Sequence, residues 1–292
     1  MSVIAVATDF STRSDRAIRR AELLAAQAGC DLLVVHVIDE DQPQSLIHAE
    51  SDACEDLLRD QQEAIAKDGR TKVTTDLRIG EAFEQIPRAA TDAGAMLIVM
   101  GPHRWQAARS AFIGTTVERT VKNSPLPVLV ANSPPAPGYD RVLVTTSLNA
   151  NSATSIRFVN HAPFLQGAEV LLLHVYDSAD MEMQSRAMIP AEERRHRQGM
   201  DRLYAQEMLA GFAEENGLKA GRYLVRESCG SVAADIMQAA SEQKADLITI
   251  APGTKSFLEL AIVGRISHAI LRRAECDVLV FPALTEGENS SV

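Results

Sequence analysis

The sequence lacks the features of several broad classes of protein. It has no run of eighteen apolar residues, so no transmembrane helix is predicted. The first twenty residues carry charges where a signal sequence needs an apolar core, so no signal peptide is predicted either. We therefore expect a soluble, cytoplasmic protein with no membrane partner.

Basic charge and paired cysteines are also scarce. The chain has 29 Lys and Arg against 39 Asp and Glu, a net charge of −10, and basic residues gather only in the patch at 192–197. Nucleic acid is therefore not an expected partner. The four cysteines show no Cys-x-x-Cys spacing, which indicates reduced thiols in place of a disulfide framework. They are Cys30, Cys54, Cys229 and Cys276.

The motifs of common catalytic and metal sites are missing as well. No histidine has another at i+3 or i+4, so we expect no metal site. Neither a Gly-x-Ser-x-Gly elbow nor a Gly-x4-Gly-Lys-Ser/Thr loop occurs, and no catalytic residue is predicted. His36 and His174 end equivalent strands, so a structural hydrogen bond is the expected role of each.

What the chain does contain is an internal repeat. Residues 33–39 recur at 171–177, an offset of 138, whereas residues 128–130 recur at 278–280, an offset of 150. The second repeat must therefore carry an insertion of 12 residues, which we place within 178–217. That segment is rich in methionine and is the least repeat-like part of the chain. Such residues either line an adaptable binding surface or form ordinary core.

The segment Asn132–Asp140 between the repeats holds three prolines and a glycine, which are typical of a linker. The predicted domains are 1–133 and 139–284. In each, short Val, Ile and Leu runs alternate with segments of helical period. This pattern predicts two tandem α/β domains, each a doubly wound, Rossmann-like parallel sheet covered by helices on both faces.

One stretch of the first repeat favours an anion site. A predicted strand ends at Gly101, and Gly114-Thr115-Thr116 opens the next helix. Free backbone N–H groups and the helix dipole attract anions at such a place. The sequence therefore predicts nucleotide phosphates at the carboxyl end of this strand, although Thr115 is also an ordinary N-cap.

These motifs resemble the universal stress protein family. Its nucleotide loop runs Gly, two residues, Gly, nine residues, Gly, then Ser or Thr. Gly101 and Gly114-Thr115 fit that frame, while Arg104 stands at the second glycine. The segments 3–11 and 33–39 are similar to the first two strands of the family. The resemblance implies an adenine nucleotide, ATP, as ligand, and final strands 128–130 and 278–280 that pair as an intramolecular pseudo-dimer.

The resemblance also implies roles for single residues. Asp9 contacts the nucleoside part of the ligand, and the backbone of Val37 holds adenine. From the residues alone, Asp9 or Ser11 is an ordinary cap of the following helix, and Val37 is an ordinary buried strand valine. Gly114, Thr115 and Thr116 contact phosphate. Arg104 binds phosphate bidentately in place of the glycine amide, closes the phosphate groove, or is an ordinary solvated loop arginine.

The second repeat departs from this pattern. Ser147, Ala251, Thr254 and Arg265 stand opposite Asp9, Gly101, Arg104 and Thr115, and only Gly264 is kept. We therefore expect a degenerate second site, although Arg265 near a helix N-terminus could still attract an anion.

The leading interpretation is a stress-response or regulatory protein with ATP in the first repeat. The alternative is an interaction protein that binds no nucleotide because both sites have decayed. Slow ATP hydrolysis ranks last, since Asp9 is the one evident general base. The protein partner is not predicted, and a further homodimer stays open.

Overall fold

A computed structural model gives the structure of the chain over most of its length. The described residues are 2–67, 69–102, 115–176, 191–218, 221–228, 230–252 and 264–283. Of the predicted insertion at 178–217, residues 178–190 lie outside the described residues. Within the described part, no helix is both long enough and apolar enough to cross a membrane.

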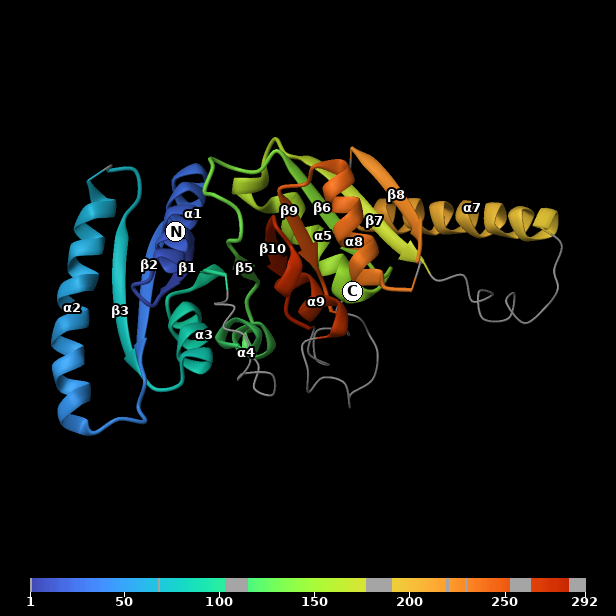
Figure 1. The fold of residues 1–292 in the computed structure, drawn as a ribbon. Helices are drawn as coiled ribbons and strands as arrows, with labels where there is room; N and C mark the ends of the chain where they lie inside the picture. The colour runs from blue at the N-terminus through green and yellow to red at the C-terminus, as the bar shows by residue number, and fades with distance from the viewer. Residues whose placement is uncertain are drawn as a thin grey trace.

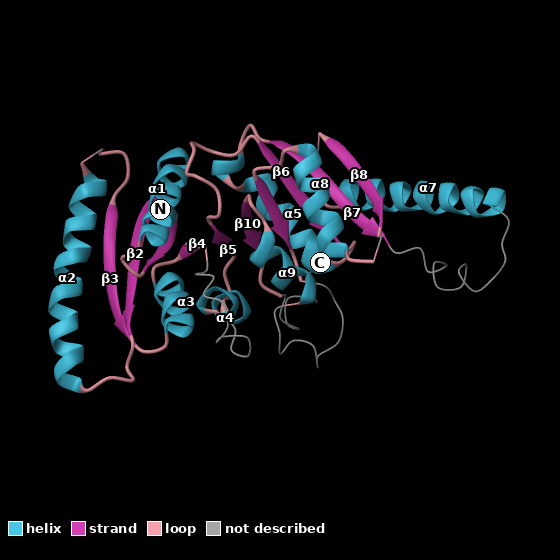
Figure 2. Ribbon diagram, in the orientation of Figure 1, coloured by secondary structure: helices cyan, strands magenta, loops and turns pink. Residues whose placement is uncertain are grey.

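Strands and helices alternate through both repeats, as the sequence predicts (Figure 2). The first repeat contains β1 (Val3–Thr8), α1 (Thr12–Ala28), β2 (Asp31–Ile38), α2 (Gln44–Ala66), β3 (Val73–Ile79), α3 (Ala82–Asp92), β4 (Ala95–Met100), α4 (Thr116–Asn123) and β5 (Val128–Val130). The second contains β6 (Arg141–Thr146), α5 (Ala150–His161), a 3-10 turn (Pro163–Leu165), β7 (Glu169–Tyr176), α7 (Ala191–Glu215), β8 (Arg222–Glu227), α8 (Val232–Gln243), β9 (Leu247–Ile250), α9 (Arg265–Arg273) and β10 (Asp277–Val280).

All ten strands join one sheet, in the order β3-β2-β1-β4-β5-β10-β9-β6-β7-β8. Neighbouring strands within each repeat are parallel. The repeats meet at β5 and β10, which pair antiparallel with Leu129 opposite Leu279 (Figure 1). This pairing gives each final strand a neighbour on both sides, so neither is an open edge. The predicted intramolecular pseudo-dimer is confirmed.

The hydrophobic core forms two layers, one on each face of the sheet. Leu129 and Leu279 belong to the layer beneath α1, α2, α5 and α7, whereas Val128 and Val278 belong to the layer beneath α3, α4, α8 and α9. Because side chains alternate along a strand, both layers run unbroken across the seam between β5 and β10. The two repeats therefore share one core on each face.

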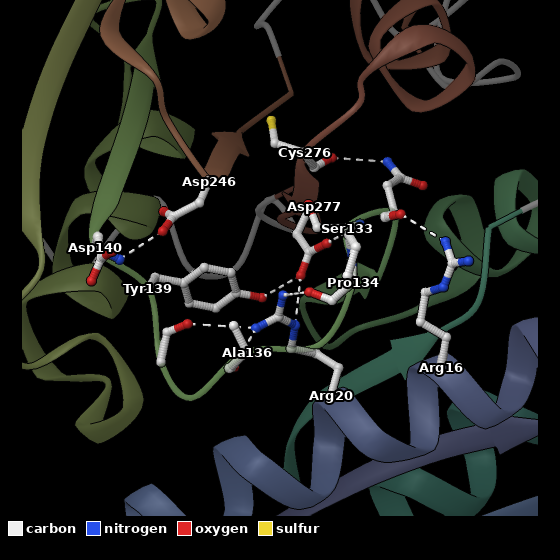
Figure 3. Close-up of polar contacts among 12 residues, drawn as sticks. Arg16, Arg20, Ser133, Pro134, Ala136, Tyr139, Asp140, Asp246, Cys276 and Asp277 are labelled. Carbon is white, nitrogen blue, oxygen red and sulfur yellow. Dashed lines mark hydrogen bonds and ion pairs between the residues drawn. The ribbon is translucent and has the colours of Figure 1, made fainter.

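A buried ion pair fastens the repeats at this seam. Arg20 of α1 places Nε 2.9 Å from Oδ2 of Asp277 at the start of β10, and both side chains are almost fully buried (Figure 3). The linker residue Tyr139 donates its hydroxyl to the same oxygen at 2.7 Å, and the N–H of Ser133 donates to Oδ1 at 2.8 Å. Burial, with Asp277 beside it, raises the pKa of Tyr139 well above its usual value, so the hydroxyl stays protonated and donates.

The linker itself is held by side chains that bind its backbone groups. Arg20 also donates to the linker carbonyl oxygens of Pro134 and Ala136. Farther along, the N–H groups of Asp140 and Arg141 donate to the carboxylate of Asp246 at 2.7 and 3.0 Å. The proline-rich segment is therefore a packed part of the seam, fixed to elements of both repeats.

Candidate functional site

A cleft of about 370 Å³ lies at the carboxyl ends of β1, β2 and β4 and at the start of α4. Four of the residues predicted from the sequence line it together: Asp9, Val37, Gly101 and Thr116. Thr115, the residue before α4, lines a neighbouring cavity of about 420 Å³ at the seam. The predicted Arg104 and Gly114 lie outside the described residues.

The backbone of Val37 faces the cleft because of its place in β2. The N–H of Gly80 donates to the carbonyl of Ile38 at 2.9 Å, so Ile38 points toward β3. Successive residues of a strand direct their backbone groups to opposite sides, so Val37 points toward β1. The last residue pair between β1 and β2 is Thr8 with His36. Val37 thus presents an N–H and a C=O one residue beyond the end of β1.

His36 and Phe10 shape the turn that closes this end of β1. The His36 ring donates from Nδ1 to the carbonyl of Thr8 at 2.8 Å, the structural hydrogen bond expected from the sequence. The Phe10 ring lies 4.4 Å from the His36 ring, between centroids. Phe10 has φ 54°, a left-handed conformation that is strained for a bulky residue. This left-handed conformation turns the chain sharply after Asp9, which lies at the rim of the cleft.

Asp9 is tied to the start of α1 without being its cap. Ser11 is the N-cap, and its Oγ accepts from the N–H of Ser14. The N–H and Oγ–H of Ser11 in turn donate to Oδ1 of Asp9 at 3.1 and 2.5 Å. Burial raises the pKa of Asp9, but the hydrogen bonds from Ser11 and Ser14 and the charge of Arg13 outweigh it, so the pKa lies below its usual value. Asp9 is therefore an ionised acceptor at neutral pH.

Gly101 has a packing role that is separate from any ligand. A Cβ at this position would lie 2.7 Å from the carbonyl oxygen of Arg13 in the first turn of α1. No real side chain fits at that distance from rigid backbone. The absence of a side chain at Gly101 therefore lets the end of β4 and the start of α1 approach closely, which brings Asp9 and Thr116 to the same cleft.

The start of α4 is closed by a capping box. Thr115 Oγ1 accepts from the N–H of Glu118 at 3.2 Å, and the Glu118 carboxylate accepts from the N–H of Thr115 at 3.0 Å. The N–H groups of Thr116 and Val117 have no partner inside the helix, and both residues line the cleft. These two amides and the positive end of α4 are complementary to an anion.

Glu118 also links the first repeat to the second. Its Oε1 lies 3.1 Å from Nε2 of His268 and 3.8 Å from Nε of Arg272, both on α9. The carboxylate is nearly buried, so these contacts across the seam hold it in place. The residue that caps the candidate phosphate site thus rests on the neighbouring repeat.

Comparison with known proteins decides the family. The profile of the universal stress protein family matches residues 1–132 and again 138–282. The chain belongs to the universal stress protein family.

Individual relatives agree with this assignment. A candidate universal stress protein of Staphylococcus saprophyticus is 30% identical over 142 residues, which cover 46% of this chain and 85% of the relative. A counterpart from Staphylococcus haemolyticus is 28% identical over 142 residues, 46% of this chain and 86% of that protein. The solved structure of a universal stress protein from Archaeoglobus fulgidus has a TM-score of 0.66 at 18% identity and covers 96% of this chain and 98% of its own. It shares the fold along both repeats.

The second universal stress repeat keeps part of the cleft frame. His174 donates from Nδ1 to Thr146 O at 3.0 Å, and Leu148 has φ 55°, the counterparts of His36 and Phe10. At the phosphate end, however, Ala251 replaces the packing glycine, and the N-cap of α9 is Gly264, which offers no side-chain cap. The second repeat therefore keeps the histidine and the left-handed turn of the first and lacks the packing glycine and the side-chain cap.

Sequence reasoning missed some of the residues that line the first cleft. Arg13 lies in the first turn of α1 and supplies a cation, while Ile86 of α3 and Met100 of β4 supply the apolar wall. The position of Arg13 shortly after Asp9 was a usable signal, because both fall at the strand-to-helix turn. Ile86 and Met100 gave none, since apolar residues of a helix and a buried strand read as ordinary core. Within the described residues, no cluster of three or more His, Cys, Asp or Glu is arranged to hold a metal ion.

Proposed function

We propose that this universal stress protein is a cytoplasmic regulator that binds an adenine nucleotide, ATP, in the cleft of the first repeat. The observation that carries the proposal is the convergence of Asp9, the Val37 backbone, Gly101 and Thr116 on one cleft. They come from three strand ends and one helix start that are far apart in the sequence. This is the edge of a doubly wound sheet at which ligands bind.

Each part of a nucleotide has a complementary group in the cleft. The N–H and C=O of Val37 suit the edge of adenine, which offers one acceptor and one donor. The ionised Asp9 accepts hydrogen bonds from the ribose hydroxyls. The phosphates take the amides of Thr116 and Val117, with Arg13 as a nearby cation. We extend the phosphate site to Arg104, Gly114 and Thr115 from the spacing of the sequence motif.

The cleft favours binding of ATP without efficient hydrolysis. The described lining holds one carboxylate, Asp9. Its lowered pKa makes it a weak general base. The nucleotide would then act as a signal whose presence is read by other parts of the protein, as in a regulatory protein.

Calorimetric titration of nucleotide-free protein with ATP tests this function. We expect one equivalent of ATP per chain. Asp9→Ala should weaken binding by about tenfold or more, because a ribose hydroxyl then loses a charged acceptor. Ser147→Ala is the matched control at the equivalent place in the second repeat and should leave affinity unchanged. Two equivalents of ATP, or loss of binding in Ser147→Ala alone, would contradict the proposal.

A second function, an interaction protein that binds no nucleotide, has one observation in its favour. Glu118 places a nearly buried carboxylate at the start of α4 and takes the amide of Thr115, where a phosphate would compete with it. Glu118→Gln separates the two functions. In a nucleotide-binding protein this change should tighten ATP binding, because it removes a negative charge near the phosphates. In an interaction protein neither the parent nor the variant should bind ATP.

A further inference from the structure

The side chain of Glu118 is shared between the two repeats. Its Oε2 accepts from the N–H of Thr115 at 3.0 Å, which completes the capping box of α4. Its Oε1 lies 3.1 Å from Nε2 of His268 on α9. Because an ionised carboxylate only accepts hydrogen bonds, this imidazole nitrogen carries the proton and donates. One oxygen of the carboxylate therefore serves the candidate phosphate site, and the other contacts the second repeat.

His268 occupies the place in the second repeat that Glu118 has in the first. The two positions differ by 268 − 118 = 150, the offset that also relates the final strands of the repeats. Equivalent positions contact each other directly only beside the two-fold axis that relates them. Two first repeats arranged in this way would bring glutamate against glutamate, and their like charges would repel. This chain has a hydrogen-bond donor at one of the two positions.

The contact of His268 serves the first repeat. In α4 the residue at this place closes the capping box, whereas the N-cap of α9 is Gly264 and no side chain caps that helix. The imidazole of His268 instead reaches across the seam to Glu118. The second repeat has no capping box of its own, and its residue at that place holds the capping residue of the first.

Arg272 lies one turn after His268 on α9 and contacts the same oxygen of Glu118. Its Nε lies 3.8 Å from Oε1, the distance of an ion pair that is too long for a hydrogen bond. Glu118 and Arg272 both line the seam cavity of about 420 Å³, so the carboxylate has space to move toward the guanidinium. Because Glu118 is nearly buried, its oxygens need hydrogen-bond donors in either position.

A phosphate at the start of α4 would change which donors hold Glu118. Phosphate oxygens would compete with Oε2 for the N–H of Thr115. A nearly buried oxygen that loses its donor costs free energy unless another donor replaces it. His268 and Arg272 already contact the other oxygen of the same carboxylate, so they are placed to replace the lost donor.

We propose that His268 and Arg272 are positioning residues for the nucleotide of the first repeat. When the phosphates take the N–H of Thr115, the carboxylate of Glu118 moves onto these two donors, and Arg272 offsets its negative charge. Nucleotide binding thereby changes the contact between α4 and α9, and the second repeat responds to the ligand through this contact. The inference rests on the proposed binding of ATP and assigns the second repeat a part in it.

Two variants of His268 test the need for a donor. His268→Leu removes the donor and should raise the dissociation constant for ATP about three- to tenfold, measured by calorimetric titration of the full, nucleotide-free chain. His268→Gln keeps an N–H donor in place of Nε2 and should stay within about twofold of the parent. A parent that binds no ATP overturns the proposed function and this inference together. A His268→Leu protein that binds ATP as tightly as the parent overturns this inference alone.

Two neighbouring arginines on α9 make a matched pair. Arg272→Ala and Arg273→Ala remove the same charge at adjacent positions. Of the two, Arg272 lies on the side of α9 that carries His268, because residues four apart share a helix face. Arg272→Ala should weaken ATP binding, and Arg273→Ala should leave it as in the parent. Equal losses would assign the effect to the net charge of α9 and overturn the role of Arg272.

A double-mutant cycle tests whether His268 acts through Glu118. In the Glu118→Gln protein, the further change His268→Leu should alter ATP affinity by less than about twofold, because the carboxylate that His268 holds is gone. A loss as large as in the parent would show that His268 acts by another route, which overturns the proposal.

The imidazole resonances of His268 give a readout that a purely structural role would not change. In NMR spectra of the full chain, these resonances should shift when ATP binds to the parent and stay in place when it binds to Glu118→Gln. His268→Gln identifies them among the seven histidines. Resonances that do not respond to bound ATP in the parent, or that respond equally in Glu118→Gln, overturn the proposed route across the seam.

Discussion

The two repeats of this protein share a backbone frame at the end of their first strand and differ in the side chains placed on it. In both repeats a histidine holds the carbonyl at the end of the first strand, and the next turn contains a left-handed, non-glycine residue, Phe10 or Leu148. The first cleft adds an ionised carboxylate, a packing glycine and a capped helix. At those places the second repeat has Ser147, Ala251 and a helix α9 with no side-chain cap.

This difference distinguishes residues that the fold requires from residues that a ligand would require. The histidine and the strained turn join a strand to a helix, so a repeat needs them even without a ligand. The start of α5 in the second repeat is held without a carboxylate at Ser147, because Asn149 caps the helix by accepting from the N–H of Ser152. The close contact at Gly101 is different again, since it serves packing and the cleft at once.

The largest effect is expected when the buried ion pair between the two repeats is removed. Asp277→Ala leaves the Arg20 guanidinium buried without its carboxylate, and it also strips a partner from Tyr139. We expect a loss of about 3–5 kcal/mol in the free energy of unfolding, measured in urea. Arg59→Ala, which breaks an exposed pair with Asp56, is the control and should cost no more than about 1 kcal/mol. Equal losses would show that the seam is not the stabilising feature we describe.

Exchanging the residues after β4 and β9 comes next in size. Gly101→Ala forces a methyl group against the Arg13 carbonyl, so we expect a loss of about 1–3 kcal/mol and weaker ATP binding. The reverse change, Ala251→Gly, relieves no clash and should alter stability by less than about 1 kcal/mol. Urea unfolding and calorimetry measure both effects. A Gly101→Ala protein as stable as the parent would remove the packing role from Gly101.

The helix starts offer a smaller test. Thr115→Ala removes the capping box of α4 and should cost about 0.5–2 kcal/mol. Gly264→Ser gives α9 the side-chain cap that it lacks and should add a few tenths of a kcal/mol, roughly, to stability. Thermal unfolding of both variants gives the two shifts. Shifts of the same sign would contradict the assigned caps.

The acid side of the stability curve should show the smallest effect. The pKa of Asp9 is lower in the folded protein than in the unfolded chain, so the ionised carboxylate stabilises the fold above the unfolded pKa. That stabilisation is lost as the pH falls through the folded pKa. Asp9→Asn should therefore lower stability at neutral pH and converge with the parent in acid. The exposed position keeps the difference below about 1 kcal/mol. A constant difference at all pH values would exclude titration of Asp9 as its cause.

Much of the fold could be predicted because the repeat supplies each pattern twice. The pairing of 128–130 with 278–280 follows from equivalent strands, and the convergence of Asp9, Val37 and Gly101 follows from strand ends at one sheet edge. Other features could not be predicted. The positive φ of Phe10 has no local signal, since aromatic residues rarely adopt it. The pairing of Arg20 with Asp277 joins positions 257 residues apart, and nothing in either neighbourhood points to the other.

The antiparallel pairing of β5 with β10 has a consequence for how such a protein evolves. When two identical chains form a dimer, one mutation in the gene changes both ligand sites at once. In this chain the two halves are joined covalently, so a mutation changes one half and spares the other. Selection can then keep ligand recognition in the first half while the second accumulates changes. The strand Asp277–Val280 cannot drift as freely, because the first half needs it as a neighbour.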